Sequence, residues 1–354
     1  MPTIAVGGAS GKIGGATLSA LLAHNLVPAS SIIALTSSRP GSSTFDALAA
    51  KAPGLRVRHA DFEDAASFEK ALEGVDRFFL VSTPHVELDF DRRVEVEDGS
   101  GKWEWQEVPD GQGRERHHRV AIDAAARAGV SRIYYTSLAF AFDRAAKRGK
   151  HASKAGVMRA HLRTEAYLAR QRAAGVFGSA TAVREGLYAE SWPLYLGEFA
   201  ADGGGRDAER TEVPIAGDGT ACWTAIADLG VANALVLAAP GGEFDDRTFY
   251  LSTRAGNTNG GGNAKTVSEI GALVGKARGK EIKVKVVGRA EHERYYVEER
   301  GLDAAAVRWW VGTYEALEEG ECEVDDGTLE GLLGRVGMKP TRVEEVIGKM
   351  VKRV

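Results

Sequence analysis

Three glycines near the start of the chain have the spacing that lets backbone approach a phosphate. Gly8, Gly11 and Gly14 directly follow the apolar run Ile4–Val6, and a helix-like apolar pattern begins after them. In such a strand–turn–helix setting, the glycines allow a tight turn, close approach to a pyrophosphate, and close packing of helix on strand. The first N–H groups of the helix attract the negative charge. The pattern predicts a dinucleotide site formed by Gly8, Ala9, Ser10, Gly11, Lys12, Ile13 and Gly14. An ordinary tight turn is the alternative.

The end of the second apolar run indicates which dinucleotide to expect. Proteins that bind NAD generally carry Asp or Glu there, to hold the ribose 2′-hydroxyl. This chain has Thr36, Ser37, Ser38 and Arg39, none of them acidic. The Arg39 guanidinium can form a charge-assisted fork with a phosphate, and Lys12 could reach the same group. We therefore expect NADP(H), with a surface position for Arg39 in a turn as the alternative.

Asp61 and Phe62 follow the third apolar run. The carboxylate of Asp61 would lie where an adenine amino group is expected. Asp61 could equally cap the N-terminus of the next helix, and one residue can do both.

Alternating strand-like and helix-like segments must position these residues. Strands are predicted at 4–6, 31–36, 55–60, 77–81, 132–136 and 176–183, with helices at 44–52, 65–73, 116–127 and 156–174. Short connections between alternating elements are typical of a parallel sheet. We predict an α/β fold: a Rossmann-type doubly wound parallel sheet with a smaller C-terminal α+β lobe. The NAD(P)-binding domain is expected over 1–184. Residues 185–354 would form mainly a substrate lobe, with some segments returning to the sheet.

Two segments interrupt this alternation. Residues 92–113 predict a hairpin insertion whose Trp103 and Trp105 share one face, either packed on the sheet edge or forming a flap. Residues 143–163 carry a series of Lys and Arg side chains. A solvated face is the simpler interpretation, and a patch facing phosphate or another acid is the alternative.

Composition argues against several classes of protein. The 354 residues are 44% hydrophobic and 27% charged, with a net charge of −4, which favours neither a nucleic acid nor a membrane surface as partner. No stretch approaches the roughly 18 apolar residues of a membrane-spanning helix. Cys222, Cys322 and the histidines lack metal-ligand spacing, so no metal site is expected. Sparse cysteine and no visible signal peptide predict a cytoplasmic protein.

Several motifs together resemble one known family. They are the segments 8–14, 61–62, 128–137, 161–165 and 184–190, with further similarity at 266–279 and 309–320. The chain resembles the NmrA-like family, an atypical branch of the short-chain dehydrogenases/reductases, and within it the quinone-oxidoreductase-2 type. The resemblance spans essentially the whole chain except the insertion at 92–113.

That resemblance implies NADP(H) and a cleft beneath the C-terminal lobe. It places nicotinamide near Thr136, Ser137 and the loop 184–190, with Ser82, Thr83 and Pro84 lining the cofactor. The chain departs from ordinary reductases of the superfamily, because no tyrosine has a lysine four residues further on. Glu185 also stands where related chains often have Asn. It could tune substrate choice or simply pair with Arg184.

The absence of a tyrosine with a lysine four residues further on favours a reaction that needs no side chain dedicated to donating a proton. A quinone accepts hydride to give an anion stabilised by aromaticity, which solvent or a phenol such as Tyr188 can protonate. Lys154 or His161 could supply positive potential for that oxyanion, although His161 could instead pair with Glu165 one helical turn away. We expect an NADPH-dependent oxidoreductase that transfers hydride to a quinone or another small conjugated carbonyl. The alternative is a non-catalytic NADP(H) redox sensor that binds a regulatory protein.

Overall fold

Seven parallel strands form the central sheet of the computed structural model, which describes residues 1–83, 92–95, 103–106, 111–201, 204–256 and 262–352. The strands are β1 (Ile4–Val6), β2 (Ile32–Thr36), β3 (Arg56–His59), β4 (Arg77–Leu80), β7 (Arg132–Leu138), β10 (Ser179–Glu185) and β14 (Thr248–Leu251). Their order is β14-β10-β7-β4-β1-β2-β3. The chain runs from β1 outward to β2 and β3 and then crosses to β4 on the other side of β1. In doubly wound folds, dinucleotides bind where the strand order reverses in this way. The predicted Rossmann sheet is confirmed.

Alternating side chains of these strands fill two separate cores. Phe79 and Ile4 face one side of the sheet, while Phe78 and Ala5 face the other. All four are at most 1% exposed. Strands buried on both faces read as continuous apolar runs, which is why these segments were recognisable in the sequence.

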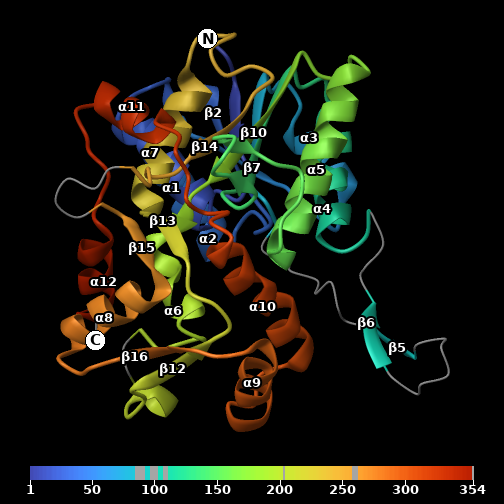
Figure 1. The fold of residues 1–354 in the computed structure, drawn as a ribbon. Coiled ribbons are helices and arrows are strands. Elements are labelled where there is room, and N and C mark those ends of the chain that lie inside the picture. Colours follow the sequence, from blue (N-terminus) through green and yellow to red (C-terminus); the bar gives the residue numbers. More distant parts are fainter. Residues whose placement is uncertain (84–91, 96–102, 107–110, 202–203, 257–261, 353–354) are drawn as a thin grey trace.

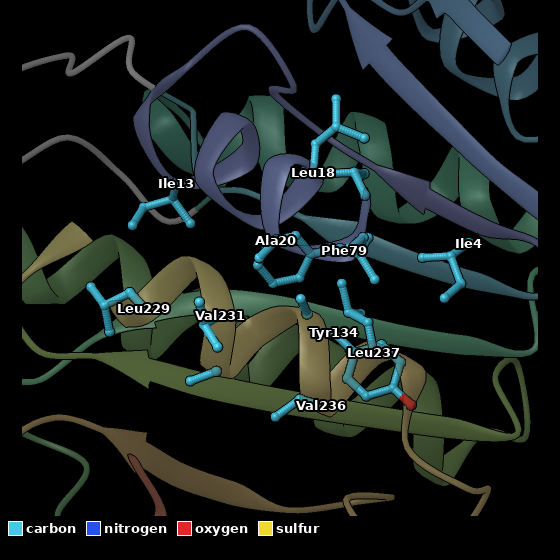
Figure 2. Close-up of a cluster of buried hydrophobic side chains, with 14 of the residues drawn as sticks. Ile4, Ile13, Leu18, Ala20, Phe79, Tyr134, Leu229, Val231, Val236 and Leu237 are labelled. Atoms are coloured by element: carbon cyan, nitrogen blue, oxygen red, sulfur yellow. The ribbon is translucent and has the colours of Figure 1, made fainter. Parts of the chain in front are cut away.

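Helices cover both faces of the sheet (Figure 1). On the face of Phe79 lie α1 (Lys12–Ala23), α2 (Ser43–Ala49), α7 (Ile226–Ala238) and α11 (Thr328–Arg335). On the opposite face lie α3 (Ala65–Ala71), α4 (Arg114–Arg127) and α5 (Gly156–Ala173). Figure 2 shows α1 and α7 packed over Phe79 and Tyr134. A Cβ on Gly230 would lie 2.6 Å from the Cβ of Ala16, so the glycine permits this close helix contact.

A further group of elements forms a third core away from the central sheet. Its strands are β11 (Leu187–Tyr188), β13 (Thr220–Thr224) and β15 (Ala264–Thr266) in one sheet, and β12 (Glu212–Ile215) with β16 (Lys283–Val286) in another. Its helices are α6 (Trp192–Tyr195), α8 (Val267–Arg278), α9 (Arg289–Arg294), α10 (Ala304–Glu318) and α12 (Val343–Val351). Short 3₁₀ helices are η2 (Ala189–Ser191) and η3 (Gly205–Asp207) in this part of the chain, and η1 (Ala29–Ser31) between α1 and β2. A π-helical turn, η4 (Tyr295–Glu299), follows α9. Trp192, Tyr195 and Trp223 are at most 5% exposed and pack in this core.

Two segments from the C-terminal half belong to the N-terminal sheet and its helical layers. β14 pairs with β10 at the sheet edge, and α7 packs on α1. The division into residues 1–184 and 185–354 stays a prediction. A capping box begins α8, in which Thr266 and Glu269 are bonded reciprocally.

The basic segment 143–163 lies against an acidic segment that follows α10. Short strands β8 (Phe142–Asp143) and β9 (Arg148–Gly149) begin it. Its ion pairs are Arg144–Glu323 (3.0 Å), Lys147–Asp325 (3.0 Å), Lys150–Glu321 (3.1 Å) and Lys154–Glu319 (3.5 Å). Four cations expected to face solvent or an anionic ligand are therefore matched by carboxylates of the chain itself.

The predicted hairpin insertion is present. β5 (Arg92–Glu95) and β6 (Trp103–Gln106) pair antiparallel, with Val94 opposite Glu104. Its turn and the side-chain packing of its tryptophans lie outside the described residues, so the choice between edge packing and a flap stays open.

Within the described ranges, no helix is long and apolar enough to cross a membrane. The same ranges hold no cluster of three or more His, Cys, Asp or Glu side chains placed to bind a metal.

Candidate dinucleotide site and the polar network beneath it

The glycine turn joins β1 to α1 through backbone contacts with two neighbouring strands. The Gly7 N–H donates to the Phe79 carbonyl of β4 (2.9 Å), and the Ala9 N–H donates to the Leu35 carbonyl of β2 (2.9 Å). Gly8 has φ +58°, a left-handed conformation that favours glycine. A Cβ on Gly14 would lie 2.3 Å from the Gly8 carbonyl oxygen, so only glycine lets α1 start this close to the turn.

The N-terminus of α1 is open to an anion. Its N-cap is Gly11, no side chain caps it, and its first turn has no acidic residue. Ser10, Gly11 and Lys12 are exposed, whereas Ile13 is buried beneath them. Uncapped N–H groups and the helix dipole together suit a pyrophosphate, so this cradle fits a dinucleotide.

The end of β2 presents hydroxyls and one exposed cation. Thr36 is buried, and its Oγ1 lies 3.3 Å from Ser10 Oγ and accepts the Ser38 N–H (3.2 Å). Ser37 and Arg39 are exposed. Among the described residues, the Arg39 guanidinium has no hydrogen-bond or ion-pair partner. This position therefore has an unengaged cation and no carboxylate.

Lys12 is exposed at the start of α1, and its expected contact with the 2′-phosphate stays a prediction. Burial raises the pKa of Glu190 in η2, and the positive charge of Lys12 partly opposes that rise. No contact in the described part of the chain joins Lys12 to Arg39. The charge of Lys12 thus acts on Glu190, in the segment after β11.

Asp61 is not the cap of the following helix. Asp64 caps α3, because its Oδ1 accepts the N–H groups of Ala66 (3.1 Å) and Ser67 (3.2 Å). Asp61 instead accepts the Glu63 N–H at 3.0 Å. The capping alternative for Asp61 is wrong, and contact with adenine stays a prediction.

Phe62 packs against two rings near the same strand end. Its ring stacks on His117 with centroids 5.4 Å apart, and lies 5.0 Å from the ring of Phe68. It is half-buried, so part of its ring is accessible beside Asp61.

The ends of β4 and β7 are tied together by side chains expected near nicotinamide. The Ser82 N–H donates to Thr136 Oγ1 (2.8 Å). The Thr83 N–H donates to His118 Nε2 (3.2 Å), and Ser82 Oγ lies 3.1 Å from the same nitrogen. Pro84 lies outside the described residues.

A buried polar network continues from His118. Because Nε2 accepts the Thr83 N–H, the neutral ring carries its proton on Nδ1 and donates to Thr164 Oγ1 (2.8 Å), whose own hydroxyl donates to the Ala160 carbonyl. The Tyr135 hydroxyl lies 2.9 Å from His161 Nδ1. Burial, aided by the positive charge of Arg114, holds the pKa of both histidines well below its usual value. Burial raises the pKa of Tyr135. The network is therefore uncharged at neutral pH.

Ser137 belongs to a second, ionic group on the same face. Its Oγ donates to Glu165 Oε1 (2.5 Å), and Arg184 donates to both Glu165 oxygens at 3.0 and 2.8 Å. Glu165 is thus occupied by Ser137 and Arg184, and the expected pair between His161 and Glu165 is not formed.

Two of the three catalytic candidates do not occupy the expected setting. His161 is buried and neutral, so it supplies no positive charge for an oxyanion. Lys154 is about half exposed and paired with Glu319 at 3.5 Å.

Tyr188 is the third candidate, and its role in the site stays a prediction. It is half-buried on β11, and burial together with the nearby Glu185 raises the pKa of its phenol. No cation lowers that pKa enough to make the phenol a strong acid at neutral pH.

Glu185 does not pair with Arg184. Adjacent strand residues point to opposite faces, so Arg184 reaches α5 while Glu185 accepts a hydrogen bond from Asn233 of α7 (2.7 Å). Sequence reasoning missed Asn233, His118 and Tyr135 as partners. Asn233 has a sequence signal, because it is a polar residue inside an otherwise apolar run, whereas His118 lies in a polar stretch and gives none.

Comparison with known proteins gives a consistent result. A family model described as NAD(P)H-binding matches residues 8–175. The NmrA-like family domain-containing oxidoreductase flvB of Aspergillus flavus is 26% identical over 339 residues, which cover 94% of this chain and 91% of that protein. Quinone oxidoreductase 2 of Escherichia coli is 30% identical over 328 residues, covering 93% and 88%.

Solved structures share the fold along the whole chain. The NADPH complex of an E. coli NADPH-dependent quinone oxidoreductase matches with a TM-score of 0.70 and 24% identity, covering 98% of this chain and 99% of that one. The Citrobacter sp. triphenylmethane reductase matches with a TM-score of 0.69 and 24% identity, covering 99% of both chains. The chain belongs to the NmrA-like family of NAD(P)H-binding oxidoreductases.

Proposed function

We propose that this NmrA-like oxidoreductase uses NADPH to reduce a quinone or another small conjugated carbonyl. Relatives named as a quinone oxidoreductase and a triphenylmethane reductase support an extended, conjugated acceptor. The site residues of this chain give the proposal its physical basis.

The glycine turn and the end of β2 are the part that would hold the cofactor. The uncapped N-terminus of α1 would bind the pyrophosphate, because no side chain occupies those N–H groups. Arg39 would bind the 2′-phosphate, since it is exposed and residues 36–39 at the end of β2 include no carboxylate that would repel the phosphate. Thr136 and Ser137 would lie beside nicotinamide, which supplies a hydride when the cofactor is bound.

The observation that carries the proposal is the neutral network below those strand ends. His118 and His161 are neutral, and Tyr135 has a raised pKa and is hydrogen-bonded to His161. A site of this kind holds its groups rigidly but offers no strong acid. A simple ketone needs a proton as it is reduced, whereas a quinone gives an anion stabilised by aromaticity. The chain would position the acceptor and exclude water, and solvent would protonate the product later.

A screen of NADPH oxidation tests this proposal. We expect acceptor-dependent turnover with quinones or conjugated enones, and little with simple ketones and aldehydes. The rate of NADPH oxidation should rise with the concentration of the acceptor until the enzyme is saturated. Spontaneous decay of NADPH does not depend on the acceptor, so this dependence identifies enzymatic turnover. Tight NADPH binding with no turnover on any acceptor would contradict the proposal and favour a redox sensor that acts through a protein partner.

A further inference from the structure

The carboxyl of Glu185 is isolated from water at the end of β10. Glu185 and its partner Asn233 are both 0% exposed. Asn233 Nδ2 donates to Glu185 Oε1 at 2.7 Å. Glu185 Oε2 and Asn233 Oδ1 are both buried and have no hydrogen-bond partner among the residues that the structure describes.

Those two unpaired oxygens have a common explanation. A carboxylate oxygen and an amide carbonyl can only accept hydrogen bonds, so an ionised Glu185 would leave both atoms without donors. A protonated Glu185 has an O–H on Oε2 that can donate to Asn233 Oδ1. The acid and the amide would then form a closed pair with two hydrogen bonds, and neither residue would keep an unsatisfied atom.

The groups around Glu185 do not stabilise a negative charge on it. Arg184 points to the opposite face and is bound to Glu165. Other ionisable groups on the elements around it include Lys12 on α1, Tyr134 on β7, Tyr188 on β11, Glu190 in η2, Asp228 on α7, and Glu330 and Arg335 on α11. Arg335 is paired with Glu243. Asp228 accepts from Thr341, and Glu330 accepts the Arg254 N–H. Burial raises the pKa of Glu185 to about 8.

The segment from Glu185 to Glu190 is fastened to α7 at both ends. The Glu190 carboxylate accepts the Ile226 N–H at the start of α7 (3.1 and 3.2 Å), and Glu185 binds Asn233 seven residues along the same helix. Between them, the Gly186 N–H donates to the Leu251 carbonyl (2.7 Å), and a Cβ on Gly186 would lie 2.3 Å from Thr224 Oγ1. Tyr188 is held within this short, tightly packed span.

We propose that Glu185 and Asn233 form a proton-sharing positioning pair that holds Tyr188 at the acceptor side of the site. Deprotonation of Glu185 breaks one of the two bonds and places a negative charge near the phenol. The effect on turnover rests on the proposed function, whereas the shared proton does not. Glu185 acts through Tyr188 and touches no substrate.

The first test is the pH dependence of kcat/KM for an acceptor, between about pH 6 and about pH 10. We expect the wild type to lose about tenfold or more through a group that titrates near pH 8. Glu185→Gln keeps both bonds to Asn233 without a titratable group. It should retain activity at pH 6 and lack this decline. Glu330→Gln is the matched control, because Glu330 is also a carboxyl with a raised pKa and one unpaired oxygen, but it is only partly buried and lies on α11. Its profile should follow the wild type.

The second test is independent of activity. The infrared carbonyl band of a protonated carboxylic acid should be present in the wild-type protein at pH 6, disappear as the pH rises through about 8, and be missing from Glu185→Gln. If the band is absent from the wild type, or if Glu185→Gln retains the alkaline decline, the proposal is overturned. If no acceptor is reduced by any variant but the band titrates as expected, the proposed function fails while the proton-sharing pair stands.

Discussion

Replacement of Arg184 by methionine tests how much the ionic group beneath Ser137 stabilises the fold. The Arg184 guanidinium donates to both oxygens of Glu165, at 3.0 and 2.8 Å, and to the Tyr250 hydroxyl at 2.8 Å. It also donates to two carbonyl oxygens, of Ala141 and Lys150, each at 3.3 Å. The side chains of Arg184 and Glu165 are only 2% and 10% exposed. Water can therefore not replace the lost partners.

The expected loss follows from the charge that remains. Removing one member of a buried ion pair costs about 3–5 kcal/mol, because the other charge is left without compensation. We expect this loss for Arg184→Met, where Glu165 retains, within the described part of the chain, only the bond from Ser137. The double variant Arg184→Met/Glu165→Met should lose about 3 kcal/mol or less, because no unpaired charge remains.

Urea unfolding at pH 7, followed by circular dichroism, measures these free energies. The matched control is Arg172→Met, since Arg172 donates to both oxygens of Asp246 at 2.8 and 3.0 Å but both side chains are 42% exposed. An exposed pair should contribute about 1 kcal/mol or less. If Arg184→Met were no more destabilising than Arg172→Met, burial would not be the source of the effect. If the double variant were as unstable as the sum of both single variants, the two charges would not be coupled.

Three further predictions concern the cofactor, the proton and pH. Arg39→Ala should weaken NADP(H) binding by about tenfold or more and leave NAD(H) nearly unchanged, because one charge-assisted phosphate contact contributes about 1.5–3 kcal/mol; equal losses for both cofactors in calorimetric titration would remove Arg39 from this role. Tyr188→Phe should lower kcat by less than about tenfold and act mainly by raising KM, because an acceptor anion can be protonated by solvent and the phenol serves to position the acceptor; a loss of kcat of about 10² or more with intact cofactor affinity would identify Tyr188 as a catalytic acid. Folding raises the pKa of Glu185 from 4.5 to about 8, so its stabilising contribution is complete below pH 4.5 and is lost as the pH rises to 8. Relative to Glu185→Gln, the wild type should therefore lose about 3–5 kcal/mol of unfolding free energy over that interval, and parallel pH profiles in urea would contradict this.

The central sheet could be predicted because its strands are buried on both faces and separated by regular helices. The glycine turn could also be predicted, because its three glycines stand directly between the apolar run of β1 and the helical pattern of α1. Helix α7 gave no comparable signal. Residues 228–234 are buried without a break, so the helix lacks the polar face that makes helical periodicity visible.

The polar contacts of the site could not be derived from spacing. Glu185 and Asn233 are 48 residues apart, and only the packing of α7 on the sheet brings them together. The pairing of the basic segment 143–163 with acids after α10 had a weak signal, because the acidic run 315–326 is visible in the sequence. Opposite charge in two segments does not by itself show that they meet.

The position of β14 has a consequence for biosynthesis. This strand forms one edge of the sheet and pairs with β10 through Ala182 and Thr248, so sheet assembly must wait until residue 251 has been synthesised. During that interval β10 is an uncovered edge, and the surface of α1 that α7 later covers is exposed to solvent. Such partly built sheets are prone to aggregate. A fragment ending at residue 184 should consequently need a chaperone or remain insoluble, although it contains the entire glycine turn.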